Sequence, residues 1–153
     1  MRLTSFSDYS LRLLILCAAR APELVTIAEA ATIYGISRNH LMKVANELTK
    51  GGFLRSVRGR NGGLHLARPA EEISIGKVVR MMEGGGEFVE CFVPGNIGCV
   101  IAPACGLKFL FASALEDFFK RLENLFIALS VDLISERNYV FLRSPQLRLH
   151  RKP

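Results

Sequence analysis

The sequence predicts a mainly α-helical fold with one small β-hairpin near its middle and a long helix towards its end. Three observations predict it: apolar residues recur at helical spacing in most segments, a glycine-rich stretch separates two short alternating segments, and a coiled-coil pattern follows residue 105. With 153 residues, of which 50% are hydrophobic, the chain can build one compact core and is not intrinsically disordered.

Three helices are expected in the first third of the chain. Residues 7–20 carry apolar side chains at helical spacing, and a proline closes the segment. Residues 26–34 open with a threonine followed three positions later by a glutamate, which is a capping box. Gly35 permits a tight turn, and residues 37–48 begin with a serine that can cap the third helix. The last two helices form a predicted helix-turn-helix.

A β-hairpin is expected directly after these helices. Residues 53–57 and 64–67 alternate as short strands, and the tip between them reads Arg58-Gly59-Arg60-Asn61-Gly62-Gly63. An amphipathic helix over residues 74–83 completes the unit. Residues 1–83 are therefore expected to form a winged helix-turn-helix domain.

Three further segments follow residue 83. Residues 84–105 are irregular, rich in Gly and Pro, and carry three of the four cysteines. Residues 106–135 are expected to form a long dimerisation helix, and residues 136–153 a C-terminal segment with a basic tail. The apolar seam of the long helix consists of Phe111, Leu115, Phe118, Leu122, Leu125 and Leu129.

The excess positive charge is confined to the first part of the chain. Residues 1–68 hold ten Lys or Arg and four Asp or Glu, a net charge of +6, whereas residues 69–153 hold ten of each. Such an asymmetry favours a nucleic-acid contact surface. The second helix of the helix-turn-helix and the hairpin tip supply groups that suit the bases and phosphates of duplex DNA. The predicted DNA-binding residues are Ser37, Arg38, Asn39, His40, Lys43, Arg58 and Arg60.

Other readings of these segments have less support. An ordinary helical hairpin with a solvated polar face would share the helix pair but not the basic hairpin. A phosphate-binding loop is disfavoured because neither Gly-Lys-Ser/Thr nor a helix follows the glycines. No catalytic constellation or cofactor fingerprint is found in the sequence, so an enzyme is not expected. The apolar run 13–19 is far shorter than the about 20 residues of a membrane span, and we interpret it as a buried helix of a cytoplasmic protein.

Three of the cysteines predict a metal or cluster site. Cys91, Cys99 and Cys105 follow the pattern C-x7-C-x5-C, which lacks the paired C-x2-C of zinc knuckles and is not a ferredoxin spacing. The segment ends at a helix start, which favours thiolate. Cys17 has apolar neighbours and is expected to pack inside. Three thiolates leave a tetrahedral centre one ligand short, which suits a sensor. The candidates for the fourth ligand are Asp8, His65, Glu87, Glu90, water and a small thiol.

The chain resembles the bacterial winged-helix repressors that carry an iron–sulfur cluster, and within that family its nitric-oxide-sensing branch. The resemblance runs from Met1 to about Asp132. It is carried by Met1-Arg2-Leu3-Thr4 with Asp8-Tyr9, by Ser37-Arg38-Asn39-His40-Leu41-Met42-Lys43-Val44, by Val57-Arg58-Gly59-Arg60-Asn61-Gly62-Gly63, by Pro69 and Ile75-Gly76-Lys77-Val78-Val79, and by Cys91, Cys99 and Ile101-Ala102-Pro103-Ala104-Cys105.

The resemblance implies a cluster-gated repressor. It implies a homodimer joined by the long helix and a 2Fe–2S or 4Fe–4S cluster on Cys91, Cys99 and Cys105. The fourth ligand would be Asp8 of the partner subunit, and the alternative for Asp8 is an ordinary acidic residue at a helix start, near Ser7. The cluster-bound dimer would bind palindromic operator DNA and release it when the cluster is nitrosylated by nitric oxide or lost, which would derepress nitrosative-stress genes.

Three alternatives remain at this point. An iron- or cluster-status-responsive repressor of the same family would have the same architecture and a similar cysteine spacing. A DNA-binding protein stabilised by structural zinc would have no sensing role. A small iron–sulfur electron carrier is disfavoured by the basic first half of the chain.

Overall fold

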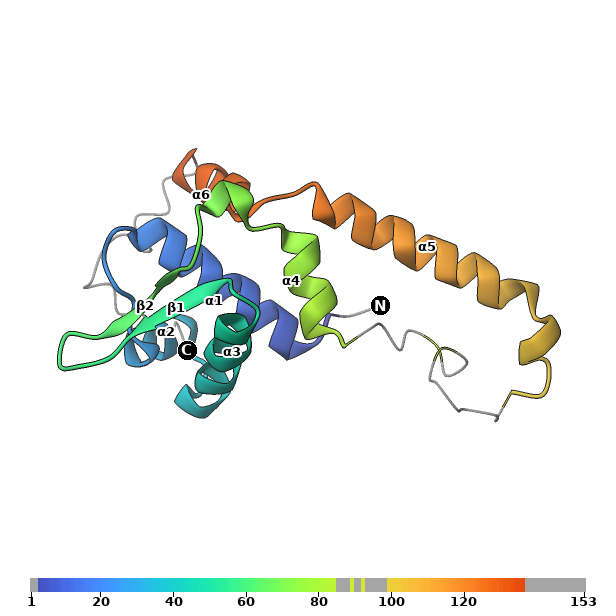
Figure 1. Cartoon of the computed structure of the whole chain (residues 1–153), viewed down its shortest axis with the longest axis horizontal. Helices are drawn as coiled ribbons and strands as arrows, with labels where there is room; N and C mark the ends of the chain where they lie inside the picture. Colours follow the sequence, from blue (N-terminus) through green and yellow to red (C-terminus); the bar gives the residue numbers. More distant parts are fainter. Residues whose placement is uncertain (1–2, 85–88, 90–91, 93–98, 137–153) are drawn as a thin grey trace, which may run out of the picture.

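The computed structural model describes residues 3–84, 89, 92 and 99–136, and it confirms the mainly α-helical fold with a two-stranded hairpin (Figure 1). The α1 to α4 helices and the hairpin form one body, from which α5 projects as an arm. In chain order the elements are α1 (Ser5–Arg20), α2 (Ile27–Tyr34), α3 (Arg38–Lys50), β1 (Leu54–Val57), β2 (Gly63–Leu66), η1 (Ala70–Glu72), α4 (Ile75–Met82), η3 (Ala102–Ala104), α5 (Gly106–Glu123) and α6 (Ile127–Glu136).

Side-chain caps begin both helices of the helix-turn-helix, as the sequence predicts. The hydroxyl of Thr26 accepts a hydrogen bond from the amide of Glu29 at 3.1 Å, and the hydroxyl of Ser37 accepts one from the amide of His40 at 3.2 Å. Gly35 lies between the helices with a φ of 65°, in the left-handed region that favours glycine. These contacts fix where α3 starts and in which direction it leaves the turn.

The core is built around α1. Its side chains Leu13, Leu14 and Leu16 have no exposed surface, so the apolar run near the start of the chain is a core helix. The α3 helix packs one face into the same cluster. The buried residues of that face are Leu41, Val44, Ala45 and Leu48. Within the part of the chain that the structure describes, no helix is long and apolar enough to cross a bilayer.

The hairpin is fixed to the helix-turn-helix at its base. β1 and β2 pair antiparallel, with Val57 opposite Gly63. Backbone hydrogen bonds of 2.9 Å and 2.8 Å join Val25, just before α2, to Leu64 on β2 in both directions. A Cβ atom on Gly63 would lie 3.0 Å from the carbonyl oxygen of Val25, so glycine permits this close approach. The predicted wing therefore has a set position relative to α2 and α3.

The expected continuous helix over residues 106–135 is interrupted. The long C-terminal helix is present as α5, but it ends at Glu123, and the separate helix α6 packs on α1. The linking backbone pairs with the segment before α4. The amide of Ile75 donates to the carbonyl of Leu125 at 2.8 Å, and the amide of Ile127 donates to the carbonyl of Ile73 at 3.0 Å. Because the carbonyl of Leu125 and the amide of Ile127 are bonded to this other segment, the helical pattern stops there.

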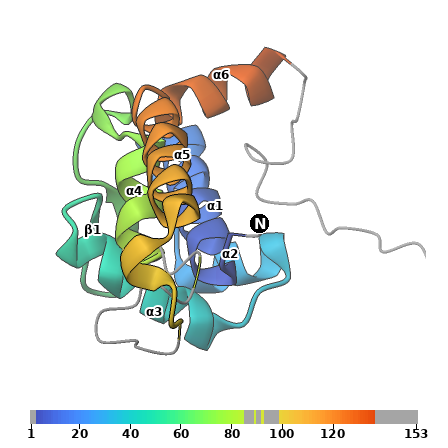
Figure 2. The same cartoon turned by 90° about the vertical axis from the view of Figure 1, so that its right-hand side faces the viewer.

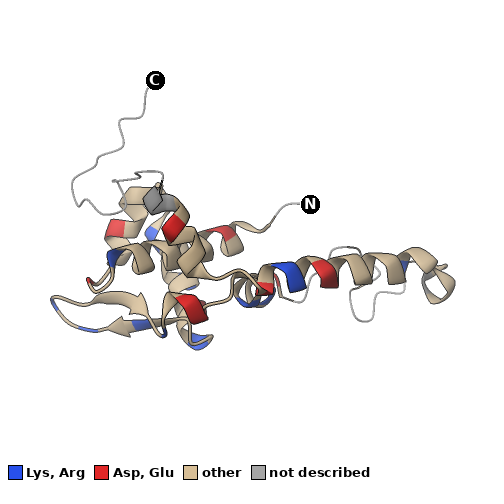
Figure 3. Cartoon of the chain, turned by 90° about the horizontal axis from the view of Figure 1, so that it is seen from above, with Lys and Arg blue, Asp and Glu red and all other residues tan. Residues whose placement is uncertain are grey.

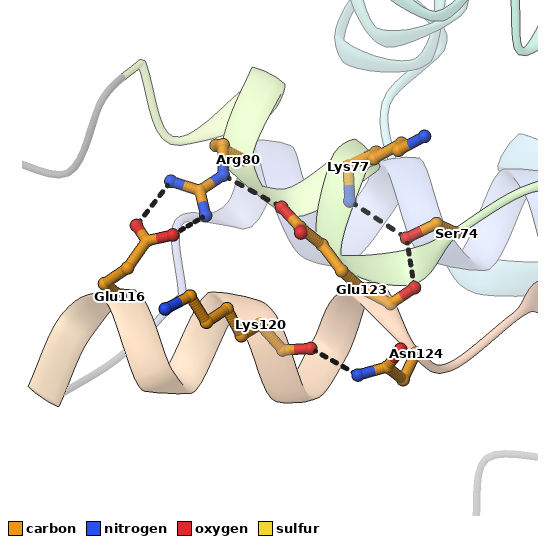
Figure 4. A network of polar contacts seen from close by, with 7 residues as sticks. All are labelled: Ser74, Lys77, Arg80, Glu116, Lys120, Glu123 and Asn124. Atoms are coloured by element: carbon orange, nitrogen blue, oxygen red, sulfur yellow. Dashed lines mark hydrogen bonds and ion pairs between the residues drawn. The ribbon is translucent and has the colours of Figure 1, made fainter.

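Arg80 on α4 joins that helix to α5 (Figure 4). Its guanidinium donates two hydrogen bonds to the carboxylate of Glu116, at 3.2 Å and 3.3 Å, and one to Glu123 at 3.2 Å. It also lies 4.4 Å from the centre of the Phe119 ring. The hydrogen bonds that Arg80 donates to Glu116 raise the pKa of Arg80 above its usual value. Figure 2 shows α4 and α5 side by side, so this cluster sets the angle at which the arm leaves the body.

Candidate nucleic-acid interface and thiolate site

The outer face of α3 carries most of the side chains predicted to read DNA. Arg38, Asn39, His40 and Lys43 are all exposed on the part of the helix surface that its core face leaves free. Ser37 caps the helix, so its hydroxyl orients the first turn. The structure therefore leaves four predicted contacts exposed on α3 and gives the fifth a capping role.

The tip of the wing presents the two predicted arginines to solvent. Arg58 and Arg60 are exposed on either side of Gly59, which has a φ of 120°. The amide of Gly62 donates to the carbonyl of Gly59 at 3.0 Å and closes the turn. Figure 3 shows Lys and Arg segments along the hairpin, whereas α5 carries charges of both signs. A basic tip of this kind can reach phosphates or a minor groove.

Sequence reasoning missed two further residues on the outer face of α3. Met42 is 52% exposed and Asn46 is also exposed. They follow Arg38 at steps of four, and this spacing places side chains on the same face of a helix. A helical projection of residues 38–50 could have identified both, because the four buried residues define the opposite side.

Asp8 takes part in an ion pair within its own helix. Its carboxylate lies 2.8 Å from the Nη2 atom of Arg12, and both side chains are partly exposed. The guanidinium of Arg12 lies 5.9 Å from the centre of the Tyr34 ring on α2, and the Tyr34 hydroxyl donates to the carbonyl of Arg12 at 3.0 Å. Burial raises the pKa of Tyr34 to about 12, so it stays a neutral donor. Asp8 is therefore linked to α2 of the helix-turn-helix through Arg12, which contacts Tyr34.

The start of α1 also contacts α3 and the end of α4. The rings of Tyr9 and His40 lie 6.4 Å apart between centres, which places the residue after Asp8 against the first turn of α3. The carboxylate of Glu83, directly after α4, accepts hydrogen bonds from the Thr4 amide at 2.9 Å, from the Thr4 hydroxyl at 3.0 Å and from the Ser7 hydroxyl. The first turns of α1 therefore contact both Glu83, directly after α4, and His40, in the first turn of α3.

The structure describes three of the four cysteines. Cys17 is 2% exposed, and burial raises its pKa to about 12, so it is the small interior thiol that the sequence predicts. Cys99 is exposed, Cys105 is half-buried, and η3 lies between them. Cys91 lies outside the described residues.

Among the described residues, the fourth-ligand candidates Asp8 and His65 form no common group with Cys99 and Cys105 within one chain. His65 lies on β2, with its Nδ1 atom 2.8 Å from a carbonyl oxygen of its own strand, and Figure 1 places the wing and residues 99–105 at opposite ends. Among the residues that the structure describes, no three His, Cys, Asp or Glu side chains converge on one point, and this includes Asp8. Glu87 and Glu90 lie outside those residues.

The surroundings of Cys105 suit a thiolate ligand. Cys105 is the N-cap residue of α5, and its side chain makes no capping hydrogen bond. The free amides of the first turn of a helix favour an anionic group, and an anionic cluster with its ligands is such a group. Together with the exposed Cys99, six residues earlier, this donor set fits a thiolate-bound metal or iron–sulfur cluster.

Comparison with known proteins places these features in a family. Residues 3–132 match the family Rrf2, described as iron-dependent transcriptional regulators. The chain is 47% identical over 124 residues to the HTH-type transcriptional regulator NsrR of Oceanobacillus iheyensis, covering 80% of this chain and 84% of the relative. It is 41% identical over 141 residues to the regulator of the same name from Bacillus licheniformis, covering 92% of this chain and 96% of the relative.

Solved structures agree on the fold. The oxidized form of CymR from Staphylococcus aureus matches with a TM-score of 0.67 and 27% identity, over 86% of this chain and 96% of that one. IscR from T. potens matches with a TM-score of 0.71 and 20% identity, over 90% of this chain and 91% of that one. The winged helix-turn-helix and the long C-terminal helix are therefore shared architecture.

Proposed function

Because this chain belongs to the Rrf2 family of transcriptional regulators, we propose that it is a nitric-oxide-sensitive repressor whose DNA binding depends on an iron–sulfur cluster. Membership makes it a regulator of transcription and not an enzyme, in agreement with the sequence. Beyond this membership, we propose the cluster, its signal and the operator. We place its action in the cytoplasm, where the DNA of a bacterium lies.

The proposed ligands come from both subunits of a homodimer. Cys91, Cys99 and Cys105 of one subunit would hold a 2Fe–2S or 4Fe–4S cluster, and Asp8 of the partner subunit would complete it. When bound, the cluster supplies iron that reacts with nitric oxide. A partner ligand is supported by the described residues, among which Asp8 forms no group with Cys99 and Cys105 of its own chain.

The single observation that carries this proposal is the set of contacts at the start of α1. Thr4 and Ser7 donate hydrogen bonds to the carboxylate of Glu83, and the ring of Tyr9 lies against the ring of His40 on α3. Arg12 contacts both carboxylate oxygens of Asp8, so ligation of iron by one of these oxygens would remove part of the ion pair seen here. The change would reach α2 through the Arg12–Tyr34 contacts and α3 through the ring contact. Loss of the ligand would return α1 to the arrangement in the structure.

An exposed apolar surface on α5 supports the dimer. Leu107, Phe109 and Leu110, near the start of α5, are between 60% and 71% exposed. A surface of this kind marks a protein contact, because large apolar side chains in water are unfavourable. The two recognition helices of such a dimer would enter major-groove half-sites about one helical turn, roughly 34 Å, apart.

Anaerobic purification tests the cluster and its ligands. The protein should be brown and contain iron, and native mass spectra should show the cluster mass before, but not after, treatment with nitric oxide. Cys105→Ala should abolish the visible absorbance, while the matched control Cys17→Ala should keep it. Colourless, zinc-containing protein would instead support the zinc-stabilised alternative and contradict the proposal.

A titration distinguishes nitric oxide from iron availability as the signal. The cluster-bound protein is treated with nitric oxide in one series and with an iron chelator in the other, while its visible spectrum and DNA affinity are followed. A nitric oxide sensor should respond to a few equivalents of nitric oxide and resist the chelator. A response to chelation alone would favour the iron- or cluster-status-responsive regulator.

A further inference from the structure

Met42 is a large apolar side chain on a surface that is otherwise polar and basic. It is 52% exposed on the outer face of α3, one turn after Arg38. Among residues 27–50, all of which the structure describes, no other large hydrophobic side chain is exposed. The remaining apolar residues of α3 face the core, so the position of Met42 is not explained by packing within the chain.

The residues around Met42 define what can cover it. Arg38 precedes it by four residues, Lys43 follows it directly, and the exposed Asn46 follows it by four. An apolar protein surface would leave these two cations without water and without anions. A partner has to present negative charge at its borders and an apolar group at its centre. The major groove of DNA does both, because phosphates line its edges and thymine displays a C5-methyl group inside it.

We infer that Met42 is a specificity-determining residue that contacts the C5-methyl group of a thymine, an inference that rests on the proposed DNA-binding function. A methionine side chain has three rotatable bonds and a polarizable sulfur, so it can follow a methyl group whose exact position varies between sites. Four residues of helix rise about 6 Å, which corresponds to about two base-pair steps. The thymine should therefore lie about two base pairs from the base that Arg38 reads.

The test uses duplex DNA selected by the protein itself. The cluster-bound homodimer enriches high-affinity duplexes from a random library, and each thymine of the enriched site is then replaced in turn by deoxyuridine. This replacement removes one methyl group and leaves the hydrogen-bonding edge unchanged. Fluorescence anisotropy gives the dissociation constant for the wild type, for Met42→Ala and for Met42→Leu. Met81→Ala is the matched control, since Met81 is 39% exposed on α4.

One thymine in each half-site should be sensitive. For the wild type, deoxyuridine at that position should weaken binding about fourfold, as expected for one buried methyl group. Met42→Ala should bind thymine and deoxyuridine duplexes equally, whereas Met42→Leu and Met81→Ala should keep the difference.

Two results would overturn the inference alone. They are a wild type that is indifferent to deoxyuridine at every position, and a methyl effect that persists unchanged in Met42→Ala. Failure of the wild type to enrich any sequence would overturn the proposed function as well.

Discussion

Arg38 and Asn39 occupy the first turn of α3, where a recognition helix contacts base edges, whereas Arg58 lies at the tip of the wing. We expect Arg38→Ala or Asn39→Ala to weaken binding to the selected site by about 1–3 kcal/mol while changing binding to unrelated duplexes much less. Arg58→Ala should lower affinity for both kinds of duplex and reduce the salt slope by about one. Anisotropy titrations at several salt concentrations measure both quantities, and uniform losses for Arg38→Ala would contradict its role as a base reader.

The buried thiol of Cys17 predicts a loss of stability at high pH. Its pKa is about 12 in the folded chain, whereas an ordinary thiol titrates at 9.0. Above pH 9 the unfolded chain loses a proton that the folded chain keeps, so the free energy of unfolding falls as the pH rises towards 12. Between pH 8 and pH 10.5 this group should cost about 2 kcal/mol.

Urea unfolding of the cluster-free protein measures this loss, and Cys17→Ala provides the control because it lacks the titrating group. The wild type should lose stability faster than the variant over this pH range. Parallel pH curves for the two proteins would show that the thiol does not titrate as proposed. Burial is the main cause that raises the pKa of Tyr34 to about 12, and this burial is common to both proteins, so most of the Tyr34 contribution cancels in the comparison.

At the scale of the elements, the crossing of α4 and α5 depends on Gly76. A Cβ atom at this position would lie 2.7 Å from the carbonyl carbon of Leu122 and would collide with the amide nitrogen of Glu123. Gly76→Ala should therefore push the arm away from α4 and destabilise the protein by about 1–3 kcal/mol. Gly106→Ala is the matched control, because a Cβ there meets nothing within 4 Å. Equal unfolding midpoints for the two variants would contradict this account of the crossing.

The elements of the body were predictable because local signals determine their ends. Thr26, Gly35 and Ser37 each favour the conformation that the structure shows. The break between α5 and α6 was not predictable, because the heptad pattern runs on through Leu125 and Leu129. Backbone pairing with the segment before α4 stops the helix, and this contact between segments about 50 residues apart leaves no local trace.

The candidate sites were also predictable only where local sequence signals determine them. Residue type and helical spacing were enough to place Arg38, Asn39 and Lys43 on one exposed face. The pairing of Asp8 with Arg12 follows from their i, i+4 spacing, but the contact between Tyr9 and His40 depends on how α1 crosses α3. The ligand roles of Asp8 and the cysteines stay predictions.

In the whole molecule, the proposed symmetric dimer would fix the distance between two recognition helices. Insertion of five base pairs between the half-sites rotates one of them by about half a turn of DNA, so the dimer can engage only one at a time. We expect the affinity to fall at least about tenfold. Changing the spacer sequence without changing its length is the control and should have a small effect. Unchanged binding to the lengthened site would contradict a rigid dimer.

In the proposed function, the cluster controls how tightly the dimer binds its operator. The most direct measurement is the dissociation constant for one selected duplex, determined anaerobically for the cluster-bound protein, the cluster-free protein and the cluster-bound protein after nitric oxide. The cluster-bound form should bind at least about tenfold more tightly than the other two, a coupling of about 1.4 kcal/mol. Equal affinities in all three states would contradict the claim.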